Sequence, residues 1–103
     1  MKTLEGKVAV ITGASRGLGK VIAQLFAREG AKVVLSSRTK TDIEQNVADL
    51  RAEGLNSSAF PCDVSDLKQV EDLARFTIQE YGGFDIWVNN AGIAGPYGIT
   101  LDL

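Results

Sequence analysis

The sequence contains no histidine and a single cysteine, Cys62. Without histidine, catalysis by a Ser-His-Asp triad is excluded, and one cysteine cannot form an intramolecular disulfide. A zinc site is not expected either, because such sites are built mainly from several cysteine and histidine ligands. We therefore interpret Cys62 as a small, buried hydrophobic residue, and we predict no metal site.

Long apolar runs and an excess of positive charge are also absent. No apolar stretch is long enough for a membrane-spanning helix. Residues 1–7 include charged side chains where a secretory signal would need apolar ones, which favours a cytoplasmic location. The formal net charge of -2 argues against general binding to nucleic acid, because too few cations are available to neutralise its phosphates.

The composition that remains is typical of a soluble globular protein. Of the 103 residues, 45% are hydrophobic and 23% are charged, which fits one domain with its own core. We expect this domain to span residues 1–103. The end of the chain, residues 95–103, contains Pro96 and Gly98 and shows no clear period, so a loop or the beginning of a further element is expected there.

Four short apolar segments predict strands. Residues 8–11 and 33–35 are apolar without alternation, as in strands that are buried on both faces of a parallel sheet. A weaker segment at 58–62 and a last one at 84–88 complete the set.

Helical spacing of hydrophobic residues between these segments predicts three helices. In the second helix, residues 41–44 have the spacing of a capping box, and Ser65 is the expected N-cap of the third helix. The expected buried residues are Leu18, Val21, Ile22, Leu25 and Phe26 in the first helix, Ile43, Val47 and Leu50 in the second, and Val70, Leu73, Ala74, Thr77 and Ile78 in the third.

Strands that alternate with helices over short connections predict a parallel sheet with right-handed crossovers and helices on both faces. The expected fold class is therefore α/β, a Rossmann-type doubly wound sheet that is incomplete, with about four strands and three helices. With four strands only, the outer edge of the fourth strand would be unpaired and apolar.

The first strand leads into a glycine-rich turn, T-G-A-S-R-G-L-G, at residues 12–19. Glycines let the backbone approach a pyrophosphate closely, and the N–H groups and dipole of the following helix favour negative charge. The spacing differs from G-x-G-x-x-G, although the physical demands are the same. The turn thus predicts a dinucleotide site, with a tight turn without ligand as the alternative. A P-loop is excluded, since Val21 stands where Ser or Thr must meet magnesium.

The second strand ends in Ser37 and Arg38, where NAD-binding domains carry a carboxylate for the ribose 2′-hydroxyl. Here Arg38, together with Arg16 in the turn, can bind a 2′-phosphate, each by charge-assisted hydrogen bonds worth about 1.5 to 3 kcal/mol. At about 1.4 kcal/mol for each factor of ten, two such contacts can favour NADP over NAD by about a hundredfold or more. The alternative for each arginine is a solvated surface charge.

Asp63 and Val64 follow the third strand. At this sheet edge Asp63 can accept a hydrogen bond from an adenine amino group while Val64 packs on the ring. Alternatively, Asp63 caps the helix that begins near Ser65.

These motifs together resemble the short-chain dehydrogenase/reductase (SDR) family, including its 3-oxoacyl-carrier-protein reductase-like members. The resemblance rests on L-E-G-K at residues 4–7, the turn at 12–19, Asp63 and Val64, and D-I-W-V-N-N-A-G at 85–92. It implies a seven-stranded parallel sheet that uses NAD or NADP to interconvert alcohols and ketones by hydride transfer. It also implies that Asn90, Ala91 and Gly92 line the cofactor cleft; a purely structural role of the asparagine is the alternative.

The family's catalytic Ser, Tyr and Lys lie beyond the N-N-A-G motif, and the Lys follows the Tyr by four residues. Here Asp85 follows Tyr81 at that spacing and Leu101 follows Tyr97, so no catalytic residue is assigned. The resemblance thus implies the N-terminal, cofactor-binding part of a longer homo-oligomeric enzyme, inactive alone, whose substrate is a small alcohol or carbonyl compound. The alternative is a non-catalytic nucleotide-binding module.

The predicted cofactor is NADP rather than NAD. The predicted cofactor-binding residues are Gly13, Ser15, Arg16, Gly17, Leu18, Gly19, Ser37, Arg38, Asp63, Val64, Asn90, Ala91 and Gly92.

Overall fold

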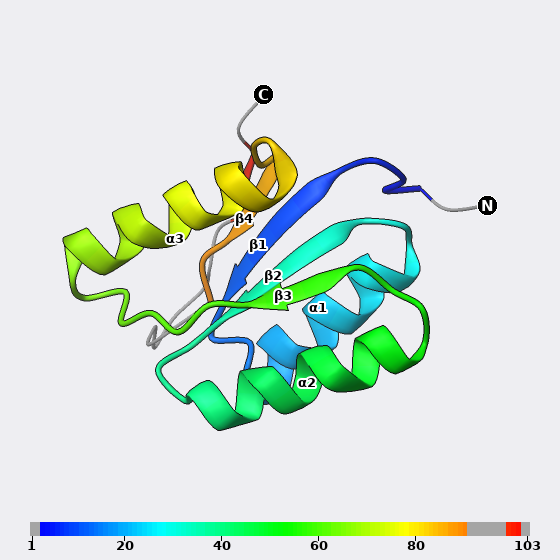
Figure 1. Cartoon of the computed structure of the whole chain (residues 1–103), viewed down its shortest axis with the longest axis horizontal. Helices are drawn as coiled ribbons and strands as arrows, with labels where there is room; N and C mark the ends of the chain where they lie inside the picture. Colours follow the sequence, from blue (N-terminus) through cyan, green and yellow to red (C-terminus); the bar gives the residue numbers. More distant parts are fainter. Residues whose placement is uncertain (1–2, 91–98, 102–103) are drawn as a thin grey trace.

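A computed structural model describes residues 3–90 and 99–101 of the chain (Figure 1). The described part is a five-stranded sheet in the order β3-β2-β1-β4-β5 with three helices. The elements are β1 (Val8–Thr12), α1 (Gly17–Arg28), β2 (Lys32–Ser36), α2 (Lys40–Ala52), β3 (Ser57–Ala59), α3 (Leu67–Tyr81), β4 (Ile86–Val88) and β5 (Ile99–Leu101).

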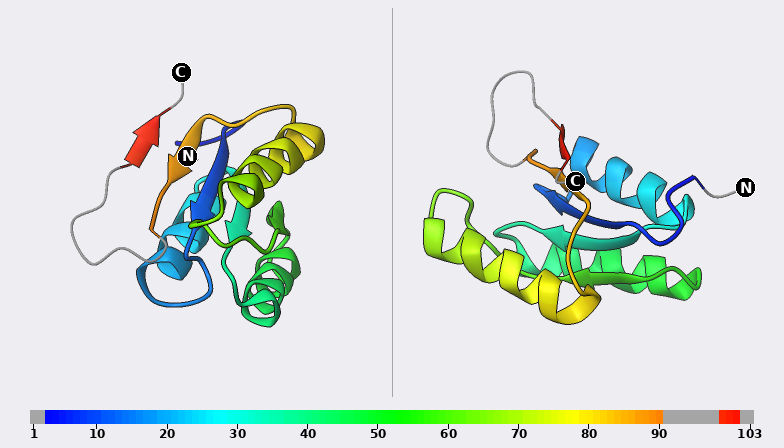
Figure 2. Two further views of the ribbon diagram at one scale, coloured as in Figure 1. Left: turned by 90° about the vertical axis from the view of Figure 1, so that its left-hand side faces the viewer. Right: turned by 90° about the horizontal axis from the view of Figure 1, so that it is seen from above.

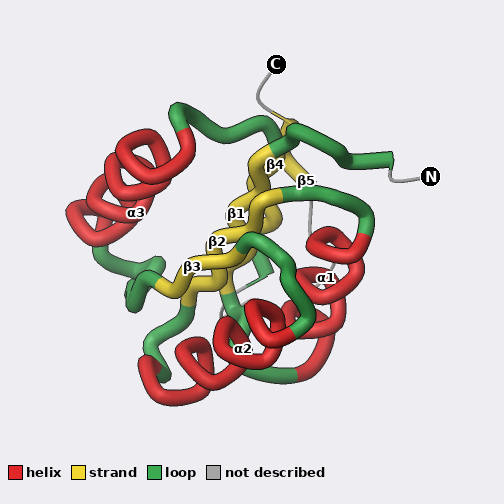
Figure 3. Tube along the Cα trace, turned by 45° about the vertical axis from the view of Figure 1, so that its right-hand side comes forward, coloured by secondary structure: helices red, strands yellow, loops and turns green. Residues whose placement is uncertain are grey.

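The first four strands are parallel, and helices cover both faces of the sheet. Figure 3 shows α1 and α2 on one face and α3 on the other. This arrangement confirms the predicted Rossmann-type doubly wound sheet. None of the described helices combines the length and the apolar character needed to cross a membrane.

The central strand β1 is buried along its whole length, which explains its unbroken apolar sequence. Ala9 and Ile11 belong to the core between the sheet and the helix pair α1 and α2. Val10, between them, belongs to the second core under α3, together with Val34 and Leu73. Alternate residues of one strand thus fill two separate cores.

The buried face of α1 differs from the predicted one. Leu18, Val21 and Leu25 were expected in the core but are 57%, 56% and 55% exposed. The fully buried residues of α1 are small, namely Gly19, Ala23 and Ala27. They recur every four residues and let the helix lie close to the sheet, so side-chain volume rather than hydrophobicity selects the face of α1 that packs there. Of the predicted face, Ile22 and Phe26 do pack against the core.

The start of α2 also differs from the prediction. Its N-cap is Thr39, without a side-chain cap, and Thr41 lies inside the helix, so the predicted capping box is wrong. The Ser37 hydroxyl instead accepts a hydrogen bond from the Thr39 N–H at 3.0 Å and fixes the chain ahead of the helix. The predicted buried residues Ile43, Val47 and Leu50 are confirmed.

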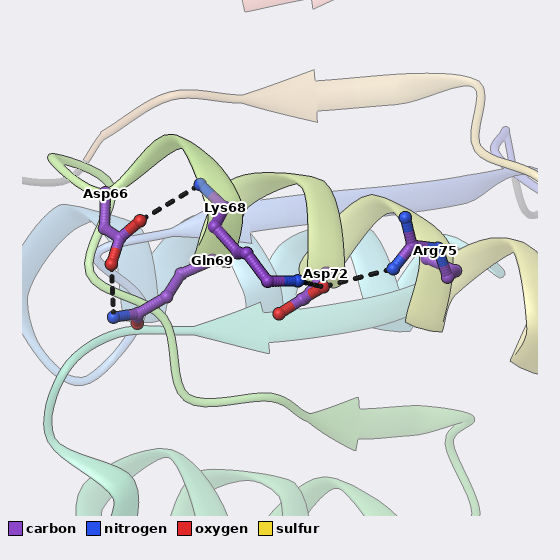
Figure 4. Close-up of polar contacts among 5 residues, drawn as sticks. All are labelled: Asp66, Lys68, Gln69, Asp72 and Arg75. Atoms are coloured by element: carbon purple, nitrogen blue, oxygen red, sulfur yellow. Dashed lines mark hydrogen bonds and ion pairs between the residues drawn. The ribbon is translucent and has the colours of Figure 1, made fainter.

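The N-cap of α3 is Asp66 rather than Ser65. As Figure 4 shows, the Asp66 carboxylate accepts hydrogen bonds from the Lys68 N–H at 3.0 Å and from Gln69 Nε2 at 3.2 Å. Further along the helix, Asp72 forms exposed ion pairs with Lys68 and Arg75, which contribute little stability. Of the predicted core residues of α3, Leu73 and Thr77 are buried, whereas Ile78 is exposed.

The outer edge of β4 is paired, contrary to the expectation of an open edge. β5 runs antiparallel to β4, with Ile86 opposite Leu101 and Val88 opposite Ile99 (Figure 2). Pro96 and Gly98, which favoured a loop, lie outside the described residues. A strand of three residues is too short to show a period in the sequence, although its β-branched Ile99 and Thr100 favour extended backbone.

Substitution of leucine by alanine tests which helix residues are buried and which are exposed. Leu73→Ala removes a fully buried side chain, and we expect it to lower the free energy of unfolding by about 2 to 5 kcal/mol. Leu25→Ala, on the exposed side of α1, should change it by less than about 0.5 kcal/mol. Urea denaturation of both variants measures this difference, and equal losses would contradict the assigned packing of α1.

Candidate functional site

A cavity of about 470 Å³ lies at the carboxyl ends of β1, β2 and β3. In Figure 1 the chain leaves these three strands at the same end of the sheet. Doubly wound sheets bind their ligands at this edge. The structure therefore brings together seven of the predicted site residues from three distant segments. The cavity is lined by Gly13, Ser15, Arg16, Ser37, Arg38, Thr39, Cys62, Asp63, Val64 and Ser65.

Four other predicted site residues are described but do not line this cavity. Gly17, Leu18 and Gly19 form the beginning of α1, and Asn90 follows β4 beside the turn. Ala91 and Gly92 lie outside the described residues.

The backbone of the turn requires glycine at two positions. Gly13 and Gly17 have φ values of 64° and 63°, in the left-handed region that other residues rarely adopt. The first helical residue is Gly17, and its N-cap, Arg16, makes no side-chain hydrogen bond to the helix. The Arg16 side chain therefore leaves the first-turn N–H groups of α1 uncapped. They lie at the N-terminal end of the helix, which favours anions.

Gly19 is required for a different reason. A Cβ atom built on it would collide with the carbonyl group of Gly13 and would lie 2.8 Å from Asn90 Nδ2. The third glycine thus allows α1 to begin directly against the turn.

Two asparagine side chains hold three consecutive carbonyl groups of the turn. Asn90 Nδ2 donates to the Gly13 oxygen at 3.3 Å. Asn46 Nδ2, from α2, donates to the oxygens of Ala14 and Ser15, each at 3.0 Å. The turn is therefore fixed from both β4 and α2.

Sequence reasoning found Asn90 but missed Asn46. The available signal was a polar residue at position 46 within the apolar face formed by Ile43, Val47 and Leu50. A buried amide needs hydrogen-bond partners, so such a residue points to a backbone that has to be held.

Thr12 links the turn to β4. Its hydroxyl accepts a hydrogen bond from the Asn90 N–H at 3.0 Å and lies 3.3 Å from the Val88 oxygen. The N-N segment therefore has a structural role in joining β1 to β4, beside any contact with a cofactor.

The two arginines of the site are exposed at the cavity. Within the described part of the chain, neither Arg16 nor Arg38 forms a hydrogen bond or ion pair through its guanidinium group. Both side chains can therefore turn toward a ligand without breaking a hydrogen bond or an ion pair.

Asp63 makes an Asx-type turn and does not cap α3. Its Oδ1 atom accepts hydrogen bonds from the N–H and the hydroxyl of Ser65 at 3.0 and 2.7 Å. These bonds, and to a lesser degree the charge of Arg38, lower the pKa of the Asp63 carboxyl below its ordinary value. The group is therefore an ionised acceptor at neutral pH, and the capping alternative is wrong because Asp66 takes that place.

Cys62 is buried between β1, β2 and α3, as expected of a small hydrophobic residue. Burial raises the pKa of its thiol, which keeps it protonated at neutral pH.

The comparisons with known proteins agree with this geometry. The family described as short chain dehydrogenase matches residues 7–101. This chain belongs to that family. Among SDR proteins it is 40% identical over 101 residues to short-chain dehydrogenase reductase 5 of Arabidopsis thaliana. It is 38% identical over 95 residues to 2,3-dihydro-2,3-dihydroxybenzoate dehydrogenase of Bacillus subtilis.

A solved SDR structure has the same fold. A short chain dehydrogenase from Mycobacterium smegmatis superposes with a TM-score of 0.86 at 34% identity, over 92% of this chain and 40% of that protein. The match with the Arabidopsis protein covers 97% of this chain but 38% of the relative, and the match with the Bacillus enzyme covers 92% and 36%. The chain thus spans less than half the length of these SDR relatives.

The packing at the turn gives a second prediction. Gly19→Ala forces a methyl group against the Gly13 carbonyl, and we expect this overpacking to cost about 1 to 3 kcal/mol of stability. Lys20→Ala, at the next position of α1, is the control and should have little effect. Thermal unfolding of both variants measures the difference. A Gly19→Ala variant as stable as the control would show that the turn does not lie against α1 as described.

Proposed function

We propose that this chain is the N-terminal, NADP-binding part of an SDR oxidoreductase that interconverts an alcohol and a ketone by hydride transfer. The observation that carries the proposal is the cavity at the glycine turn. Arg16 and Arg38 both line it, and the segment that follows β2 brings no carboxylate to it. We further propose that residues 1–103 form one cofactor-binding domain, and that the whole enzyme is a cytoplasmic homo-oligomer.

The charges of the cavity favour a ligand with a phosphate on the ribose. NAD-binding sites of this fold place an acidic residue on the ribose 2′-hydroxyl, and an acidic residue there would repel a 2′-phosphate. Here the corresponding position after β2 is occupied by Ser37 and Arg38. Both arginines are exposed, so water weakens each contact with the phosphate to the lower end of the range for charge-assisted hydrogen bonds. We therefore expect a preference for NADP of about tenfold to a hundredfold.

The remaining residues of the cavity suit the adenine ring. Asp63 is an ionised acceptor whose position is fixed by Ser65, and it can accept a hydrogen bond from the exocyclic amino group. Val64 packs against the core under α3 on one side and lines the cavity on the other, where it can contact the ring. When bound, the cofactor would supply the hydride, while these residues hold its adenosine end.

We assign no catalytic residue to the described part of the chain. Tyr81 is hydrogen-bonded to Ser58 at 2.7 Å, and the Lys32 ammonium group lies 5.9 Å from the centre of its ring. These residues combine the SDR residue types, but Lys32 begins β2, at the end of the sheet opposite the cavity. Hydride transfer therefore requires residues other than Tyr81, Ser58 and Lys32.

A non-catalytic nucleotide-binding module remains the second candidate, and one observation favours it. β5 pairs with the outer edge of β4, so the sheet does not present β4 as an open edge. Sedimentation of the purified chain together with NADP titration would separate the two functions. Only the binding-module hypothesis predicts that the chain by itself is a folded monomer that binds NADP.

Arg38→Asp tests the preference for NADP. The substitution places a carboxylate at the position where NAD-binding domains carry one, and we expect the ratio of NADP to NAD affinity to fall by about tenfold or more. Calorimetric titration with both nucleotides measures this ratio. Arg75→Asp, on α3 and away from the cavity, makes the same change of charge and should leave the ratio unchanged. An unchanged ratio in Arg38→Asp would show that Arg38 does not contact the 2′-phosphate.

The oxidoreductase proposal is tested by the complete reading frame of the gene. We expect it to encode a Tyr-x-x-x-Lys motif, in which the lysine lowers the pKa of the tyrosine so that it can exchange a proton with the substrate oxygen. The corresponding full protein should oxidise NADPH in the presence of a ketone. A frame without this motif would remove the catalytic proposal and leave the binding module.

A further inference from the structure

We propose that Asn46 is a positioning residue that fixes the spacing between Arg16 and Arg38 and thereby sets the preference for NADP. The inference rests on the proposed function, because it concerns the same phosphate site. Asn46 itself does not line the cavity and lies on α2, behind the turn.

The first step of the argument is the burial of Asn46. The residue is only 6% exposed, although it carries a polar amide. Its Nδ2 atom bridges two successive carbonyl oxygens, those of Ala14 and Ser15, at 3.0 Å each. A buried amide that makes two hydrogen bonds to one turn holds that turn in a single conformation.

The second step concerns the direction of the peptide groups. In a trans peptide unit the C=O and N–H bonds point in opposite directions. Because the carbonyl groups of Ala14 and Ser15 point to Asn46, the N–H groups of Ser15 and Arg16 point away from it. Both of these residues line the cavity. The turn over residues 14 and 15 brings the Arg16 N–H toward the Gly13 carbonyl group, whereas the Ser15 N–H has no backbone acceptor within the described residues. Asn46 thus fixes the direction of both peptide groups, and the Ser15 N–H is the backbone donor that is left for an anion in the cavity.

The third step is the link to Arg38. On one side the Ala14 N–H donates to the Ser36 oxygen at 3.0 Å, which ties the turn to the end of β2. On the other side Asn46 ties it to α2, and α2 begins at Lys40, directly after the segment that contains Arg38. The turn that contains Arg16 is therefore tied to the chain on both sides of Arg38, at Ser36 before it and at Asn46 after it. A change at Asn46 alters the spacing between them.

The consequence differs for the two nucleotides. NADP has a 2′-phosphate that would contact both arginine segments at once, whereas NAD has only hydroxyl groups at this point. A turn released from α2 should therefore bind NADP more weakly and NAD almost as before. If Asn46 had a merely structural role, its loss would weaken the binding of both nucleotides equally.

The test compares Asn46→Leu with Gln45→Leu. Leucine is close to asparagine in size but donates no hydrogen bond. Gln45 is the neighbouring amide, which is exposed on α2 and donates to Asp49. Calorimetric titrations with NADP and NAD should show the NADP affinity of Asn46→Leu reduced about tenfold, with a smaller change for NAD, so that the ratio falls. Gln45→Leu should retain the ratio of the unmodified chain.

Three results would overturn the inference. They are an unchanged NADP affinity in Asn46→Leu, an equal loss for both nucleotides, and a fall of the ratio in Gln45→Leu as well. If Asn46→Leu does not fold, Asn46→Ala removes the same donor without adding bulk, and the same comparison applies. An unmodified chain without a preference for NADP would overturn the proposed specificity and this inference together, whereas a preference that survives at Asn46→Leu or Asn46→Ala overturns the inference alone.

Discussion

The site depends on the hydrogen bonds that hold the carbonyl groups of Gly13, Ala14 and Ser15. A turn that presents its N–H groups to a ligand has to direct its carbonyl groups elsewhere, and buried carbonyl groups need donors. Asn46 and Asn90 supply these donors from α2 and from the end of β4. These bonds join α2 and the end of β4 to the turn that leads into α1. The positions of these elements around the turn define the cavity.

Much of the fold follows from the sequence because parallel strands that are buried on both faces have unbroken apolar runs. β1 and β2 carry this pattern, and each site segment begins where such a strand ends. Parallel strands bring their carboxyl ends to one edge, so Gly13, Arg38 and Asp63 could be placed in a common site before any coordinates. The membership in the SDR family and the likeness to solved SDR structures agree with this architecture.

The features that the sequence did not reveal have a common cause, since each depends on contacts between distant segments. The buried face of α1 is chosen by the small size of Ala23 and Ala27, while Leu18, Val21 and Leu25 are exposed. β5 is defined by its pairing with β4 rather than by a period of its own. Asn46 lies on the apolar face of α2, which predicts its burial, but its partners depend on the approach of α2 to the turn. The helix caps are an exception, because Thr39 and Asp66 were missed although the hydrogen bonds around them are local.

The central claim is that the cavity beside the glycine turn is a dinucleotide site, and amide NMR of the unmodified chain during titration with NADP tests it most directly. The account predicts that the signals of Ser15, Arg16, Arg38 and Asp63 shift and saturate together, while that of Ile78 on α3 stays in place. Shifts that are absent, or that do not include the turn and the segment after β2, would contradict it.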